Sequence, residues 1–324
     1  PHHVYAARSV RKRPLGKTGL NVSEMALGTW GISGDAYGAV EPEVAERVVR
    51  RAIDCGITLI ETADAYGAGR VEAMLKTALV GRSHDVFVVT KGGTDRTSKP
   101  PKKRFSPEYL RGAIQRSAKR LGRDRLDVYL LHNPSSECLE LGEATDAMEA
   151  FKKEGLVAHW GASVGDAETA KVAMDKGAEV IEMAYNLLHG VDLHRVAGEI
   201  MISGAGVLAR STLSYGLLAG DWTKEREFPE GDHRIDRWSK PDLARRLEQL
   251  DVLRYLVKGH VPTMRAAAIR WVLANNLVTS AVLGPRSVEQ LEQLIREVGG
   301  GPVYLPDADL LQLPRKLTKV GVLM

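Results

Sequence analysis

The strongest constraint on the fold is a regular alternation of short apolar segments with amphipathic helical segments along the chain. Runs rich in apolar and β-branched residues predict strands at 24–28, 57–60, 85–90, 126–131, 157–162, 179–184, 206–209 and 280–283. Continuous apolar strands that alternate with helices are typical of a parallel sheet covered by helices. Eight such units in 324 residues predict an α/β fold, a single closed (β/α)8 TIM barrel.

Helical periodicity and capping residues predict the segments between the strands. Ser106 followed by Pro107 is typical of a helix start, and Gly56 is typical of a helix end. The predicted helices are 44–55, 71–80, 107–121, 145–154, 166–176, 193–202, 263–274 and 287–298. A short β-hairpin is predicted before the first barrel strand, at 19–27.

Two segments depart from the repeat. Residues 211–260 form a long, charge-rich insertion after the seventh strand, with an extra helix predicted at 241–257. Loops after the strands form the C-terminal face of a barrel, so we expect either a lid or binding loop there or an extra packing helix. At the other end, we expect residues 1–12 to be a flexible basic segment, and residues 13–324 to form the barrel domain.

Composition narrows the possible functions. The net charge is only +4, and the basic stretches at 8–17 and 99–104 lack interleaved aromatic residues, so we interpret them as solvated loops rather than a nucleic-acid surface. No apolar run approaches the ~18 residues of a membrane helix, and the histidines show no metal-ligand spacing. Cys55 and Cys138 form no disulfide framework, which predicts a cytoplasmic protein.

Four polar side chains at predicted strand ends form a chemically coherent set. Glu61 and Tyr66 follow the second strand, Lys91 ends the third, and His132 ends the fourth. An inward-facing lysine in a barrel is costly unless it is paired, so Lys91 points to function. We expect its ammonium to lower the pKa of the Tyr66 phenol, which is ordinarily ~10, and His132 to orient a carbonyl oxygen. Such a set can protonate a carbonyl oxygen while hydride reaches its carbon.

These motifs resemble those of the aldo-keto reductase family over most of the chain. Residues 13–23 are similar to the hairpin that plugs the barrel bottom, 62–67 to the tyrosine motif, 89–91 to the lysine strand and 126–132 to the histidine strand. The resemblance implies NADP(H)-linked reduction of small aldehydes or ketones. Tyr66 would be the proton donor, Lys91 its pKa partner, Glu61 the carboxylate of the set and His132 the substrate orienter.

The resemblance also implies a set of binding residues. Ser163 and Glu182 would hold the nicotinamide carboxamide, and Tyr185 would stack on the ring. Ser211 and the loop from Leu213 to Leu218 would approach the pyrophosphate. The segment at Gly284 would contact the cofactor, with Arg286 on the 2′-phosphate, a group suited to its bidentate fork. Gln290 and Gln293 would contact adenine, and Trp30 would line the substrate pocket.

Three residues depart from the family pattern. Glu61 replaces an aspartate and is longer by one C–C bond, roughly 1.5 Å. Val164 and Glu182 replace amide side chains, so Val164 offers the carboxamide no side-chain bond and an ionised Glu182 offers only acceptors. Two interpretations stay open: a working oxidoreductase with a retuned site, or a nucleotide-binding barrel with weak turnover that acts as a regulatory subunit. Substrate, direction and oligomeric state are not determined by the sequence.

Overall fold

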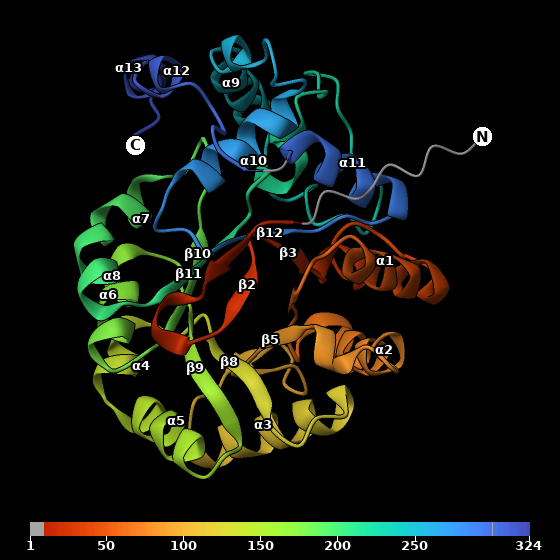
Figure 1. Cartoon of the computed structure of the whole chain (residues 1–324), viewed down its shortest axis with the longest axis vertical. Coiled ribbons are helices and arrows are strands. Elements are labelled where there is room, and N and C mark those ends of the chain that lie inside the picture. The colour runs from red at the N-terminus through yellow and green to blue at the C-terminus, as the bar shows by residue number, and fades with distance from the viewer. Residues whose placement is uncertain (1–9, 300) are drawn as a thin grey trace.

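Eight parallel strands close into a barrel in the computed structural model, which describes residues 10–299 and 301–324 (Figure 1). Around the barrel the order is β10-β11-β12-β3-β4-β5-β8-β9. The strands are β3 (Met25–Gly28), β4 (Leu59–Glu61), β5 (Phe87–Gly92), β8 (Leu126–His132), β9 (Val157–Ser163), β10 (Val180–Ala184), β11 (Gly206–Arg210) and β12 (Ser280–Leu283). The predicted fold class is confirmed, and each predicted strand end lies within two residues of the observed one.

Helices cover the outside of the barrel (Figure 1). They are α1 (Pro42–Asp54), α2 (Arg70–Ala78), α3 (Pro107–Leu121), α4 (Ser136–Glu140), α5 (Glu143–Lys153), α6 (Ala167–Asp175), α7 (Val191–Arg195), α8 (Ala197–Ser203), α9 (Lys240–Asp251), α10 (Met264–Ala274), α11 (Val288–Val298), α12 (Asp307–Leu310) and α13 (Leu313–Thr318). The predicted caps are confirmed: the Ser106 side chain accepts from the Tyr109 amide, and Gly56 follows α1 with φ of 90°.

Some helix boundaries differ from the prediction. Helix α1 starts at Pro42, two residues earlier than predicted, because a proline at the first helical position is already preset for the helix. The single helix predicted at 193–202 is two helices, α7 and α8, which meet at Val196. The short helices α4, α12 and α13 and the small hairpin of β6 (Thr94–Asp95) with β7 (Lys102–Lys103) were not predicted, since short elements carry little periodic signal.

The core has two separate apolar layers. One layer fills the barrel interior and includes Leu59, Val89, Val128, Leu130 and Leu208. The other, larger layer lies between the strands and the surrounding helices. Since successive side chains of a strand point to opposite faces, most of the strands contribute to both layers, which explains why they are apolar at most positions.

The N-terminal hairpin closes one end of the barrel. Strands β1 (Lys12–Pro14) and β2 (Asn21–Ser23) pair antiparallel, and fully buried Leu15 and Val22 join the interior layer. A Cβ at Gly16 would lie 2.2 Å from the Gly206 amide nitrogen, so only glycine allows the hairpin to approach β11 this closely. Of the segment 1–12 that we expected to be flexible, residues 1–9 lie outside the described residues and Lys12 is paired with Ser23.

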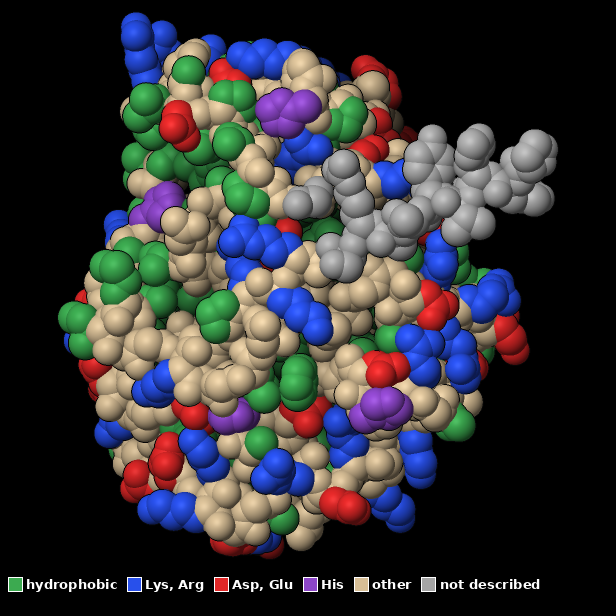
Figure 2. All heavy atoms as spheres, in the orientation of Figure 1, with side chains coloured by type: hydrophobic (Ala, Val, Ile, Leu, Met, Phe, Trp, Pro, Cys, Tyr) green, Lys and Arg blue, Asp and Glu red, His purple; other side chains and the backbone are tan. Residues whose placement is uncertain are grey.

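One basic residue is not solvated as expected. Residues 99–104 are exposed, but Arg13 is half-buried beneath the barrel, where its guanidinium donates to Glu24, to the Tyr304 hydroxyl and to backbone carbonyls of Leu273 and Val278. The prediction of a solvated loop at 8–17 was wrong for this side chain because the C-terminal segment folds back over it. On the face seen in Figure 2, cationic and anionic side chains are interspersed.

The insertion after the seventh strand lies over the mouth of the barrel. It contains a 3-10 helix at Ser214–Ala219, helix α9, and a further 3-10 helix at Arg254–Leu256, so the helix predicted at 241–257 ends at Asp251. Asp232 forms a β-bridge with Tyr37, and the His233 amide donates to the Ala36 carbonyl at 2.8 Å. The insertion is therefore fastened to the loop that follows β3. Within the described residues, no helix has the length and apolarity needed to cross a membrane.

Candidate active site

Strand periodicity places a ring of polar side chains on top of the barrel interior. Leu59, Val89, Leu130, Val180 and Leu208 belong to the interior apolar layer. The residue two positions further along each of these strands must point the same way. These residues are Glu61, Lys91, His132, Glu182 and Arg210, and all of them line one cavity. The alternation of side chains along the strands therefore brings these ionisable groups to face one another above the barrel interior.

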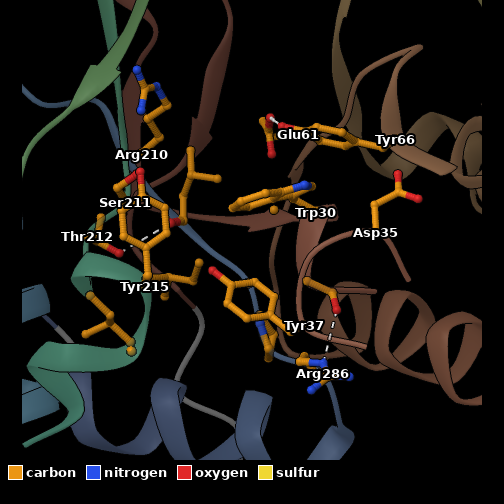
Figure 3. A pocket seen from close by; sticks show the side chains of 18 of the residues that line it. Trp30, Asp35, Tyr37, Glu61, Tyr66, Arg210, Ser211, Thr212, Tyr215 and Arg286 are labelled. Carbon is orange, nitrogen blue, oxygen red and sulfur yellow. Dashed lines mark hydrogen bonds between the residues drawn. The ribbon is translucent and has the colours of Figure 1, made fainter. Parts of the chain in front are cut away.

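The cavity has a volume of about 800 Å³ and opens at the C-terminal ends of the strands. Figure 3 shows Trp30 near its centre, Tyr66 and Glu61 on one side, and Arg210, Ser211 and Tyr215 on the other. Trp30, expected to line a substrate pocket, does line it, and its ring contacts Tyr37 edge-on at 5.5 Å between centroids. This volume lies within the ~300–1,000 Å³ typical of small-molecule sites.

Lys91 lies between two carboxylates. Its ammonium forms an ion pair with Glu61 and a second with Glu182, in which Nζ lies 3.2 Å from Oε2. All three side chains are almost fully buried. Burial lowers the pKa of the Lys91 ammonium, and the carboxylate of Glu182 opposes that shift. The expected pairing of Glu61 with Lys91 is present, whereas Glu182 contacts the lysine in addition to lining the cavity.

Tyr66 is held by Glu61 rather than by Lys91. The Tyr66 hydroxyl donates to Glu61 Oε1 at 3.2 Å (Figure 3). Lys91 Nζ lies 5.2 Å from the centre of the phenol ring. Burial, together with the negative charge of Glu182, raises the pKa of Tyr66. The net shift of this pKa is therefore upward, opposite to the expected direction, because burial of the phenol is the largest effect on it. The longer side chain of Glu61 lets it reach the phenol directly.

His132 faces Tyr66 across the cavity in an edge-on arrangement, with 6.3 Å between ring centroids. Burial lowers the pKa of His132 well below its ordinary value, and Lys91, Lys103 and Arg210 lower it further. The imidazole is thus neutral at pH 7 and has one N–H to donate. Its Nδ1 has no hydrogen-bond partner among the described residues. A neutral imidazole of this kind can orient a carbonyl oxygen, as expected.

Most residues assigned to cofactor binding line the same cavity. Ser163 and Glu182 lie near its floor, and Ser211 and Leu213 lie on the loop after β11. Gly284, Arg286, Gln290 and Gln293 come from the turn after β12 and from helix α11. One continuous cavity thus extends from the Tyr66–His132 pair to α11. Among these residues, Ser211 has positive φ (56°), as do Ser214 (46°) and Tyr215 (60°) on the same loop.

The side chains at the α11 end already have protein partners. The Arg286 guanidinium donates to the backbone carbonyls of Gly31, Gly38 and Ala39 at 3.1–3.2 Å. Gln290 accepts from the Arg286 amide at 2.8 Å, and Gln293 donates to Glu297 at 3.0 Å. Arg286 therefore fastens the loop after β3 to the turn after β12, and a phosphate at this position has to compete with three carbonyls.

Two of the expected cofactor contacts are corrected by the structure. Tyr185 does not line the cavity: its ring stacks on Trp271 of α10 at 4.4 Å, and its hydroxyl contacts His194 and Asn275. The cause is strand alternation, since Glu182 points inward and a residue three positions later points outward. Leu218 is fully buried, and the residues of its loop that face the cavity are Leu213, Tyr215, Gly216 and Ala219.

Several cavity residues were not assigned from the sequence. Tyr37 and Asp35 follow Trp30 on the loop after β3, and Arg234 comes from the insertion, where it contacts the Tyr37 ring at 4.8 Å. Arg210 ends β11 and was visible as a polar residue at a strand end, but the sequence offered no partner for it. Asp64, two residues before Tyr66, does not line the cavity. Among the described residues no cluster of His, Cys, Asp and Glu could hold a metal ion.

Comparison with known proteins identifies the family of this chain. The model of the Aldo/keto reductase family matches residues 24–298. The chain is 27% identical over 318 residues to the "NADH-specific methylglyoxal reductase" of Escherichia coli (strain K12), covering 93% of this chain and 96% of that one. It superimposes on the glycerol dehydrogenase AKR11B4 of Gluconobacter oxydans (TM-score 0.82, 25% identity, 98% and 97% coverage). The holo form of AKR11C1 from Bacillus halodurans is also similar (TM-score 0.78, 25% identity, 96% of both chains).

Proposed function

Since the chain belongs to the aldo/keto reductase family, we propose that it is an NADP(H)-dependent oxidoreductase that reduces aldehyde or ketone carbonyls to alcohols. The observation that carries this proposal is the convergence of the Tyr66 hydroxyl, a neutral His132 and buried Lys91 on one cavity. The free thiols of Cys55 and Cys138 agree with the cytoplasmic location that we propose for it.

The described residues fit a nicotinamide dinucleotide. Ser163 and Glu182 would hold its nicotinamide end, the loop at Ser211 and Leu213 its pyrophosphate, and Arg286 its 2′-phosphate. The positive φ angles of Ser211, Ser214 and Tyr215 support this, because such costly backbone conformations cluster at ligand sites. When bound, this cofactor supplies or accepts the hydride.

The chain itself handles the proton. Because burial raises its pKa, Tyr66 is a protonated phenol at neutral pH and has a proton to give. The Tyr66 hydroxyl donates this proton to a hydrogen bond with Glu61, so the hydroxyl has to turn from Glu61 to the substrate oxygen. The Lys91 ammonium, held by Glu61 and Glu182, stabilises the negative charge left on the phenol oxygen. His132 donates its N–H to the same substrate oxygen and fixes its position.

The proposal is tested with Tyr66→Phe. We expect kcat/KM for NADPH-linked reduction, measured over a panel of aldehydes and ketones, to fall by about 10²–10⁴-fold, as for loss of a positioned general acid. The Kd for NADPH, measured by quenching of tryptophan fluorescence, should change less than twofold. A variant that keeps wild-type turnover would exclude Tyr66 as the donor. Wild-type protein that binds NADPH but reduces none of the panel would favour a nucleotide-binding regulatory barrel instead.

A further inference from the structure

Tyr66 lies in a turn whose backbone conformation is costly. Tyr66 and Gly67 are the central residues of this turn, which is closed by a hydrogen bond from the Ala68 amide to the Ala65 carbonyl at 3.1 Å. Gly67, Ala68 and Gly69 follow one another with positive φ angles of 57°, 53° and 88°. An alanine keeps this left-handed conformation only where the surrounding structure holds it. The turn that carries the proposed proton donor therefore depends on contacts from outside itself.

Asp35 and Arg96 supply such contacts, one on each side of Tyr66. Asp35, on the loop after β3, accepts from the Gly67 amide at 2.6 Å through Oδ2. Arg96, which follows β6, donates through Nη1 to the Ala65 carbonyl. The two side chains also form an ion pair, in which Arg96 Nη1 lies 3.3 Å from Asp35 Oδ2. Because the Ala65 carbonyl and the Gly67 amide belong to the two peptide groups that flank Tyr66, its backbone is held on both sides.

The hairpin that carries Arg96 also contacts the backbone of His132. Lys103 of β7, the partner strand of β6, donates to the His132 carbonyl at 2.7 Å. Asp95 of β6 accepts from the Thr97 amide at 2.9 Å, so a side-chain bond fixes the turn in which Arg96 lies. The hairpin is therefore held relative to both side chains that are proposed to meet the substrate oxygen.

The ion pair of Asp35 with Arg96 lies on the side of the proton donor, away from the residues assigned to the cofactor. Both side chains line the cavity, and Figure 3 shows Asp35 on the same side as Tyr66, with Ser211 on the other. Arg70 Nη2 also lies 3.9 Å from Asp35 Oδ1. Partly exposed ion pairs of this kind contribute little to folding stability. We therefore expect their effect on the geometry of the turn and not on the free energy of unfolding.

We propose that Asp35 and Arg96 are positioning residues, which hold the two peptide groups of Tyr66 so that its hydroxyl turns from Glu61 to the substrate oxygen about a fixed backbone. This inference rests on the proposed carbonyl reduction and adds two residues that act through Tyr66. A charged group forms a stronger hydrogen bond with a backbone amide or carbonyl than a neutral group does. Without these bonds the turn relaxes toward less strained φ angles and moves the phenol, and a displacement of about 1 Å can cost about 100-fold in rate.

Kinetics of matched variants test the proposal. Asp35→Ala should lower kcat about 10- to 100-fold, while KM and the Kd for NADPH change less than threefold, because the phenol moves and the rest of the cavity stays in place. Asp35→Asn keeps an oxygen that accepts from the Gly67 amide and should recover most of kcat. Glu154→Ala removes an exposed ion pair with Arg111 that does not line the cavity, and this control should keep both kcat and KM.

A second variant tests whether the two side chains act together. Arg96→Ala should also lower kcat, and Asp35→Ala combined with Arg96→Ala should lose less than the product of the two separate losses, because both act on one turn. Losses that multiply would show that the two residues act independently and would overturn the joint role. A higher KM for Asp35→Ala at unchanged kcat would mean that Asp35 contacts the substrate, which also contradicts the inference.

A spectroscopic measurement keeps the test independent of turnover. In protein that contains 3-fluorotyrosine, Tyr66→Phe identifies the fluorine resonance of Tyr66. Asp35→Ala should shift or broaden this resonance, whereas Asp35→Asn and Glu154→Ala should leave it unchanged. An unchanged resonance in Asp35→Ala would overturn the inference and leave the proposed function standing. If the wild-type protein reduces no carbonyl, the proposed function fails, and the fluorine spectra alone decide whether Asp35 positions Tyr66.

Discussion

The two ends of the barrel each bury a glutamate–cation cluster, and the two clusters are built differently. At the bottom, Glu24 accepts from Arg13 and from the Tyr304 hydroxyl, and Arg13 also donates to two backbone carbonyls. At the top, one ammonium, that of Lys91, faces the two carboxylates of Glu61 and Glu182. The bottom cluster joins the hairpin, the first strand and the C-terminal segment, whereas the top cluster borders a cavity.

The two clusters also differ in how completely their buried polar atoms are hydrogen-bonded, and this difference indicates which end is structural and which is functional. Among the described residues, the bottom cluster leaves no buried side-chain polar atom without a partner. At the top, His132 lines the cavity and its buried Nδ1 lacks a partner among the described residues. Buried polar groups are nearly always satisfied in folded proteins, so unsatisfied ones beside a cavity indicate a ligand or chemistry. The C-terminal face carries function in this fold, and the opposite face carries stability.

The largest expected effect is on stability, at the bottom. Glu24→Gln removes the charge that compensates half-buried Arg13 and should cost about 3 kcal/mol of unfolding free energy. Urea denaturation measures this loss, and kcat/KM per folded molecule should stay within twofold of wild type. A loss of activity at unchanged stability would show that the bottom cluster is not merely structural, and would contradict the assignment of stability to the bottom and function to the top.

The matched change at the top should act on turnover. Glu61→Gln leaves Lys91 paired with Glu182, so the unfolding free energy should change little. It removes the carboxylate that holds the Tyr66 hydroxyl, and kcat should fall about 10- to 100-fold while the Kd for NADPH changes less than threefold. Steady-state kinetics and fluorescence titration check this. Equal losses of kcat and cofactor affinity would mean that Glu61 only maintains the shape of the site.

The smallest expected effect is on cofactor affinity and concerns Arg286. This arginine lies at the top but bonds to backbone carbonyls, as Arg13 does at the bottom. If it also binds the 2′-phosphate, Arg286→Ala should weaken NADPH about tenfold and NADH less than twofold. Titration of both cofactors measures the preference. Equal weakening of both would assign Arg286 to bracing the loop after β3, and the proposed NADP(H) preference would lose its main support.

Local sequence signals were sufficient for the fold and for placing several polar side chains at the strand ends that border the cavity. Strand and helix periods, together with caps such as Ser106, predicted eight repeats, and a lysine on an inward-facing position singled out Lys91. Tyr185 was misassigned because motif similarity does not determine on which face of a strand a side chain lies. Arg13 was misassigned because its partners come from residues 24, 273, 278 and 304, which no local pattern relates to it.

The sequence by itself determined the closed barrel, its hairpin plug and the placement of Tyr66, Lys91 and His132 at the strand ends. Only the tertiary structure decided how the polar side chains pair. In it, Glu61 accepts from the Tyr66 hydroxyl and Glu182 forms an ion pair with Lys91. Arg286 donates to backbone carbonyls of the loop after β3, and Arg210 has no carboxylate partner among the described residues. The physical reason is the range of each interaction. Periodicity and capping act between residues a few positions apart, whereas ion pairing and burial depend on side chains brought together from strands far apart in the chain.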